Sequence, residues 1–144
     1  MKKISLLLVC FAITTAAFAD KDKAISVDKL PAGAKQFIET HFAASKVALA
    51  KVETDFMDKT YKVVFVDGSK VEFNRKGEWK DVDCKYSQVP SAIIPQKIRE
   101  YVIANHPDAK IIEIDRDRRD YEIKLHNGLE LKFDLKFNLI DIDS

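Results

Sequence analysis

Two pairs of aspartates have a spacing that could support chemistry. Asp81 and Asp83 form the first pair, and Asp141 and Asp143 form the second. If each pair lies on a strand, its carboxylates share one face about 7 Å apart, as a general acid and base or the ligands of a cation could. Charges on a strand more commonly face charges on the neighbouring strand. We therefore expect cross-strand partners here, with a cation-binding protein as the alternative.

The other reactive side chains do not form a catalytic set. His41, His106 and His126 lie on separate expected elements, whereas a zinc site needs three or four convergent ligands. Segment 115–120 has the aspartates of a calcium loop, but it contains three arginines and lacks the glycine and final glutamate of such a loop. No serine–histidine–acid set and no phosphate-binding glycine loop occurs. The sequence predicts no catalytic residue, no metal site, no cofactor and no enzyme.

The first nineteen residues have the three parts of a secretory signal peptide. A basic start at Lys2 and Lys3 precedes an apolar run, and a small-residue motif predicts cleavage between Ala19 and Asp20. The apolar run is shorter than the about 20 residues of a membrane span, which argues against an uncleaved anchor. We expect a periplasmic protein with no membrane span after cleavage.

The mature chain, residues 20–144, has the size of one domain. The full sequence has 24 basic and 23 acidic residues, and loss of the two leader lysines leaves a net charge near −1. Proteins that bind nucleic acid or anionic membranes need a basic excess, so we expect neither partner. Cys84 is the one cysteine outside the leader, and we expect a buried, unreactive thiol.

The mature sequence contains an internal repeat. Residues 61–74 align with 121–134 without a gap at an offset of 60. Upstream of this match the offset is 64, so the first copy is four residues longer and should have a longer first hairpin. The two repeats cover about residues 30–84 and 94–144, and together they form the single domain.

Each repeat should contain one helix and four strands. Apolar residues recur at helical spacing after Leu30 and after Ile94, and they alternate with charged residues further on. The expected strands cover residues 46–54, 59–66, 69–75, 79–84, 110–116, 119–126, 129–134 and 138–143. The predicted fold class is α+β, with both helices packed on one face of an antiparallel sheet and the other face largely bare. The two repeats form either one continuous sheet or two abutting sheets.

The register of these strands decides which side chains reach the bare face. A three-residue loop ending at Gly128 pairs Leu125 with Leu129 and keeps the apolar residues on the buried face. A regular four-residue turn before the last strand of each repeat would then direct Trp79 and Leu139 to the bare face.

This register predicts a partner-binding patch on the bare face. Its residues are Val64, Val66, Trp79 and Leu139. Exposed apolar patches mark partner sites, and tryptophan is enriched among binding hot spots. We expect a protein or peptide partner, with a structural or self-associating protein as the alternative. A strand bulge would instead turn Trp79 into the core.

The turn and core residues also resemble those of a known family. The matching positions are Leu30-Pro31, Phe37-Ile38, Tyr61, Asp67-Gly68, Phe73, Gly77-Glu78-Trp79, Val82-Asp83-Cys84, Val89-Pro90 and Ile94-Pro95. Over about residues 30–143 the sequence is similar to the PepSY-like family of secreted bacterial proteins. The resemblance implies a fold like that of the β-lactamase-inhibitor protein, a periplasmic location, and a binding or inhibitory role by analogy. It transfers no functional residue, because a shared fold does not establish a function.

Overall fold

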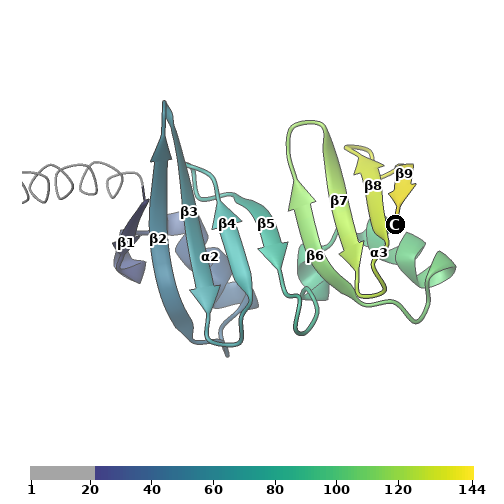
Figure 1. Ribbon diagram of the computed structural model, residues 1–144, viewed down its shortest axis with the longest axis horizontal. Helices are drawn as coiled ribbons and strands as arrows, with labels where there is room; N and C mark the ends of the chain where they lie inside the picture. The colour runs from purple at the N-terminus through teal and green to yellow at the C-terminus, as the bar shows by residue number, and fades with distance from the viewer. Residues whose placement is uncertain (1–21) are drawn as a thin grey trace, which may run out of the picture.

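The computed structural model describes residues 22–144 and shows an α+β fold with one antiparallel sheet (Figure 1). Within that range, nine strands are hydrogen-bonded in chain order from β1 to β9. The strands are β1 (Asp22–Ile25), β2 (Val47–Asp55), β3 (Asp58–Phe65), β4 (Lys70–Phe73), β5 (Trp79–Asp83), β6 (Ile111–Arg116), β7 (Asp120–Leu125), β8 (Glu130–Asp134) and β9 (Leu139–Asp143). The α-helices are α2 (Ala32–His41) and α3 (Gln96–Asn105). The expected signal peptide and its cleavage position lie outside the described residues.

Each α-helix begins directly after a proline. Pro31 precedes α2 and Pro95 precedes α3, and the fixed backbone angle of proline suits the start of a helix. Both helices lie behind the sheet in Figure 1, and each buries one apolar stripe against it. The described residues place no helix on the other side of the sheet, which we call the open face.

Similar aromatic contacts join each helix to the sheet. The ring of Phe37 on α2 meets Phe73 on β4 edge-to-face, with ring centroids 5.5 Å apart. Tyr101 on α3 meets Phe133 on β8 in the same way, also at 5.5 Å. Both Phe73 and Phe133 are fully buried. Such pairs contribute about 1 kcal/mol beyond their burial, so they help to hold the helices on this face.

The predicted hairpin register is confirmed. Val63 lies opposite Val71 on β3 and β4, and Ile123 lies opposite Leu131 on β7 and β8. The loop between β7 and β8 ends at Gly128, whose φ of +96° is one that glycine adopts without strain. The apolar residues of these strands therefore lie together under the helices.

Trp79 and Leu139 do not point to the open face, because both last strands contain a bulge; for Trp79 this is the alternative that the sequence left open. Asp81 lies opposite Glu72, yet Trp79 lies opposite Phe73, so one extra residue stands between the two pairs. The β8–β9 pair has the same irregularity, with Leu139 opposite Phe133. A bulge moves the side chains that precede it to the other face. Trp79 and Leu139 consequently pack on the helix-covered face.

The first half of the sheet is extended in two ways. Strand β1, which the sequence pattern did not predict, pairs with the outer edge of β2 and places Ile25 opposite Ala50. Strands β2 and β3 contain nine and eight residues, whereas β6 and β7 contain six each. The longer first hairpin is therefore confirmed.

Candidate functional site

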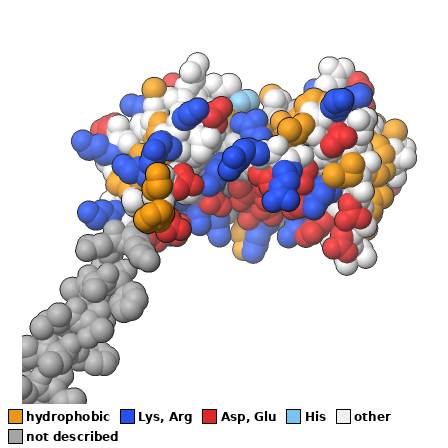
Figure 2. Space-filling model, turned by 90° about the horizontal axis from the view of Figure 1, so that it is seen from above, with side chains coloured by type: hydrophobic (Ala, Val, Ile, Leu, Met, Phe, Trp, Pro, Cys, Tyr) orange, Lys and Arg blue, Asp and Glu red, His pale blue; other side chains and the backbone are white. Residues whose placement is uncertain are grey.

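Acidic side chains line up across the middle of the open face. Glu72, Asp81, Asp115 and Glu122 lie opposite one another on the adjacent strands β4 to β7, and we call them the central acidic row. Red side chains gather in the corresponding middle part of Figure 2, with blue lysine and arginine side chains around them. Each step along the row places one carboxyl opposite another, which is destabilising when both are charged.

Lysines bound this row at both ends. Lys62 on β3 lies opposite Glu72, and Lys132 on β8 lies opposite Glu122. The Lys132 Nζ atom is 3.4 Å from Glu122 Oε1. No ion pair within 4 Å involves Asp81 or Asp115 among the residues that the structure describes. The negative charge of the row is therefore least compensated at its two central members.

The pKa values of the two central aspartates respond to this arrangement. Burial raises the pKa of Asp81 to about 8, and the hydrogen bond with Glu113 and nearby negative charges add to the rise. Burial, followed by the charges of Glu122 and Glu113, raises the pKa of Asp115 to about 6. As a carboxylate, Asp81 would leave its buried Oδ1 atom without a donor. A protonated Asp81 instead supplies its own donor to Glu113, so Asp81 is largely neutral at pH 7.

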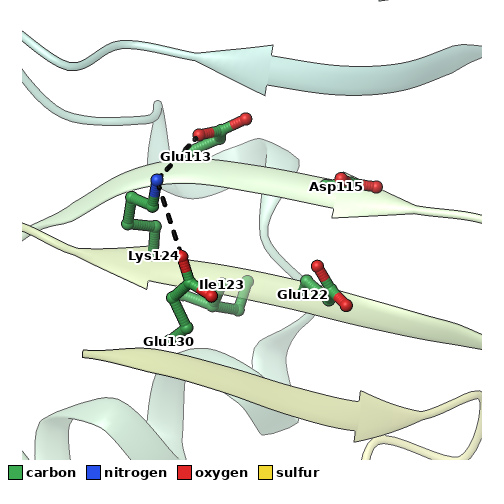
Figure 3. Close-up of a pocket in the computed structure, with 6 residues that line it drawn as sticks. All are labelled: Glu113, Asp115, Glu122, Ile123, Lys124 and Glu130. Atoms are coloured by element: carbon green, nitrogen blue, oxygen red, sulfur yellow. Dashed lines mark ion pairs between the residues drawn. The ribbon is translucent and has the colours of Figure 1, made fainter. Parts of the chain in front are cut away.

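A hollow of about 220 Å³ lies next to the acidic row. Its lining consists of Glu113, Asp115, Glu122, Ile123, Lys124 and Glu130 (Figure 3). Lys124 Nζ stands between two of these acids, 3.9 Å from Glu113 Oε1 and 3.6 Å from Glu130 Oε1. The carboxyl groups of Asp115 and Glu122 lie away from this lysine (Figure 3). Asp115, which is in no ion pair within 4 Å among the described residues, therefore remains available to a positively charged group from outside, whereas Glu122 already contacts Lys132.

Two of the four predicted patch residues lie beside this charged region. Val64 is on the open face opposite Leu49, which is 42% exposed. Val66 follows the buried Phe65 and is 67% exposed. Because alternate strand residues point to opposite faces, Val64 and Val66 share the open face with Leu49. These three residues form a small apolar patch near β2 and β3.

Trp79 and Leu139 do not join this patch. On the helix-covered side, the Arg116 guanidinium lies 3.8 Å from the centre of the Trp79 ring, and Arg116 Nε donates a hydrogen bond of 2.9 Å to the Trp79 carbonyl oxygen. Trp79 is on β5 and Arg116 is on β6. Their contact thus joins the two halves of the molecule. Leu139 packs against the core beneath β9.

The histidines and the cysteine lie apart from the acidic row. His126 Nδ1 accepts a hydrogen bond from the Lys110 amide at 2.9 Å, while His41 and His106 contact aromatic rings of their own helices. Cys84 is 1% exposed, and burial raises the pKa of its thiol. This environment favours the unreactive thiol form.

The described residues contain no group of three or more histidine, cysteine or acidic side chains arranged to hold a metal ion. In segment 115–120, Asp117 accepts hydrogen bonds from the amides of Arg119 and Asp120. These bonds lower the pKa of Asp117 and shape a hairpin turn. None of the described helices is long and apolar enough to cross a membrane.

Sequence reasoning missed the central acidic row as a unit. The sequence predicted an ordinary cross-strand partner for Asp81. It did not decide whether β5 and β6 pair. That pairing places Asp81 opposite Asp115 and Asp83 opposite Glu113. Neither contact joins residues close in sequence. In the sequence, the signal for this row was the pair of acidic residues two positions apart on β5 and again on β6.

The fold and its open face define an α+β protein with one helix-covered and one charged sheet surface. A sequence profile of the family described as "Putative beta-lactamase-inhibitor-like, PepSY-like" matches residues 59–141. The chain belongs to this PepSY-like family. Among curated proteins, none matches the sequence.

Three solved structures are similar along most of the chain. A Bacteroides thetaiotaomicron protein, described as a "putative calcium-regulated periplasmic protein", is 60% identical with a TM-score of 0.86, over 88% of this chain and 99% of its own. A "putative periplasmic protein" of the DUF2874 family from Bacteroides vulgatus is 56% identical with a TM-score of 0.85, over 88% and 99%. A second Bacteroides vulgatus protein, also described as periplasmic and "of unknown function", is 42% identical with a TM-score of 0.82, over 85% and 99%.

Proposed function

We propose that this chain is an exported, non-catalytic binding module of the periplasm. Residues 1–19 act as a signal peptide that is removed before Asp20, and residues 20–144 form one domain built from two copies of a helix-and-four-strand unit. The periplasmic descriptions of similar structures support the location. The same order of a helix followed by four strands in each half supports the duplication.

The open face of the sheet is the binding surface, and its ligand is a protein or peptide with basic residues. The observation that carries this proposal is the central acidic row, whose carboxyl groups oppose one another on four adjacent strands. A lysine or arginine placed over Asp81 and Asp115 would relieve their repulsion and favour their charged forms. The adjacent Val64 and Val66 provide apolar contact area.

This proposal is tested by comparing partners that variants recover from a periplasmic extract. The open-face variant carries Asp115→Asn and Glu122→Gln, which remove two charges with little change in shape. The matched control is Glu39→Gln, an exposed acid on α2 and so on the other side of the molecule. We expect the open-face variant alone to lose a partner that the wild type retains and that high salt releases. Equal recovery by all three proteins would refute the proposal.

Calcium binding is the second candidate, because a 60% identical protein is described as calcium-regulated. The oxygens of Asp81, Glu113 and Asp115 are the hard ligands that calcium prefers. The side chains would have to rotate, since no group of ligands among the described residues is already arranged around an ion. Calcium also competes with the proton on Asp81, so its binding should weaken on acidification.

Calorimetric titration with calcium and magnesium at pH 6 and pH 8 tests this candidate. The expected result is calcium binding at pH 8 that exceeds magnesium binding, weakens at pH 6, and disappears in Asp115→Asn. The control Asp141→Asn changes an exposed aspartate of β9 and should retain calcium binding. Binding that is unaffected by Asp115→Asn, or no binding at millimolar calcium, rules out a site in this row.

A further inference from the structure

The last described strand, β9, matches β5 in register, but no strand within residues 22–144 pairs with its outer side. Val82 on β5 lies opposite Val71, and Ile142 on β9 lies opposite Leu131 at the equivalent point. The bulges that precede these pairs are also equivalent. Beyond β5 the sheet continues with β6, whereas β9 is the last strand in the described residues (Figure 1).

The missing neighbour changes the exposure of the equivalent side chains. Val82 is fully buried, because Ile114 of β6 lies opposite it. Ile142 is 48% exposed, and Ile140, the extra residue of the bulge, is 55% exposed. A strand alongside β9 would cover Ile142 as β6 covers Val82. Burial of this aliphatic side chain would favour the pairing of such a strand.

The backbone of β9 is also available for pairing. Directly after β5, the Cys84 amide donates to the Ile112 carbonyl oxygen at 2.7 Å, so the amides of this residue and of every second residue before it face the neighbouring strand. Val82 belongs to that set, and Ile142 is its equivalent. The N–H and C=O groups of Ile142 therefore point outward at an unpaired edge, which is a template for strand addition.

The charges beside the edge restrict what can pair there. Asp141 and Asp143 lie on the open face of β9, and Glu130 lies opposite Asp143. Neither aspartate is in an ion pair within 4 Å among the residues that the structure describes. A second copy of this chain pairing through β9 would bring four aspartates together. The edge is complementary to a strand with lysine or arginine at alternate positions and apolar residues between them.

We propose that the free edge of β9 accepts an extended, basic segment of a partner protein as a tenth strand of the sheet. Its alternate basic side chains contact Asp141 and Asp143 on the open face. Its intervening apolar side chains cover Ile142 on the helix-covered face. Main-chain hydrogen bonds to Ile142 supply affinity, while the alternation of charge and apolar groups supplies specificity. This site is separate from the central acidic row.

The experiment measures binding of the wild-type protein to a synthetic heptapeptide in which lysine and valine alternate. A second peptide has the same side chains, but N-methyl groups block the backbone amides of alternate residues on its pairing edge. The protein variant Ile142→Pro removes the outward amide, a substitution that an edge strand tolerates. The charge variant is Asp141→Asn with Asp143→Asn, and urea unfolding reports whether each variant stays folded.

The unmodified peptide should shift the backbone NMR signals of β8 and β9. Its affinity should fall severalfold with Ile142→Pro, which removes one pairing bond, and about tenfold or more with the N-methylated peptide, which loses several. The charge variant should bind more weakly and with less dependence on salt. Equal binding of the two peptides, or shifts confined to β4–β7, would overturn the proposal. A wild-type dimer that Ile142→Pro dissociates would also overturn it, because the occupant would then be a second copy of this chain.

Discussion

Replacing Asp81 by asparagine should stabilise the protein, and by at least twice as much at pH 8.5 as at pH 5.5. In the folded chain, burial and the neighbouring acids Glu113, Asp115 and Glu72 raise the pKa of Asp81 from 3.8 to about 8. Between these two values the folded state holds a proton that the unfolded state has released. The stability contributed by this group is therefore full below pH 4 and is lost as pH rises to about 8.

The size of the effect follows from the same pKa shift. One unit corresponds to about 1.4 kcal/mol, so the full shift would give about 6 kcal/mol. Asp81 is only half-buried, and solvent screens much of this interaction. We expect Asp81→Asn to raise the free energy of unfolding by about 2 kcal/mol at pH 8.5. At pH 5.5 the carboxyl is neutral in the folded chain but ionised in the unfolded chain, so Asp81→Asn should stabilise the protein by less than half as much as at pH 8.5, about 1 kcal/mol.

Urea unfolding of both proteins at the two pH values, at constant ionic strength, measures this difference. Asp141→Asn is the matched control, since Asp141 occupies the equivalent position on β9 and is exposed. Its effect should be small at both pH values. The reasoning fails if Asp81→Asn stabilises equally at both values, or if it destabilises at pH 8.5.

Two further substitutions test the packing that supports the open face. Trp79→Ala removes the half-buried ring that Arg116 covers at 3.8 Å. We expect the free energy of unfolding in urea to fall by about 2 kcal/mol. An unchanged midpoint would show that the ring contributes no packing. Gly77→Ala should cost about 3 kcal/mol, because φ is +85° and the added carbon would lie 2.9 Å from the Pro31 side chain. Gly128→Ala, with a similar φ but no atom within 4 Å, should lower the thermal midpoint less, and equal losses would contradict the steric argument.

The structure also decides the orientation of Trp79, which the sequence left open between a regular turn and a bulge. A regular turn was assumed before β5, but the Asn74 side chain accepts hydrogen bonds from the amides of Lys76 and Glu78. The Asn74 amide itself donates to the Glu78 carbonyl oxygen at 2.8 Å. The strand enters the sheet after this turn with one extra residue. Alternation along a strand does not reveal such a bulge, because the extra residue depends on main-chain bonds between two strands.

Strand β1 is a second feature that local pattern did not reveal. It contains four residues, three of them exposed, so it lacks the alternation that identifies a half-buried strand. Its Ile25 packs opposite Ala50 because the edge of β2 is available for pairing. The strand thus exists through its tertiary partner and not through its own composition.

Within residues 22–144, the amino-acid sequence by itself determined both α-helices, eight of the nine strands and the hairpin register. These features depend on hydrophobic periodicity and on turn residues such as Gly128, which act over a few neighbouring positions. Only the tertiary structure decided that β5 pairs with β6 and so places Asp81 opposite Asp115. Only the tertiary structure shows that no strand within residues 22–144 pairs with the outer edge of β9. Both features arise from pairing between distant segments, where burial and charge act across strands and leave no local pattern in the sequence.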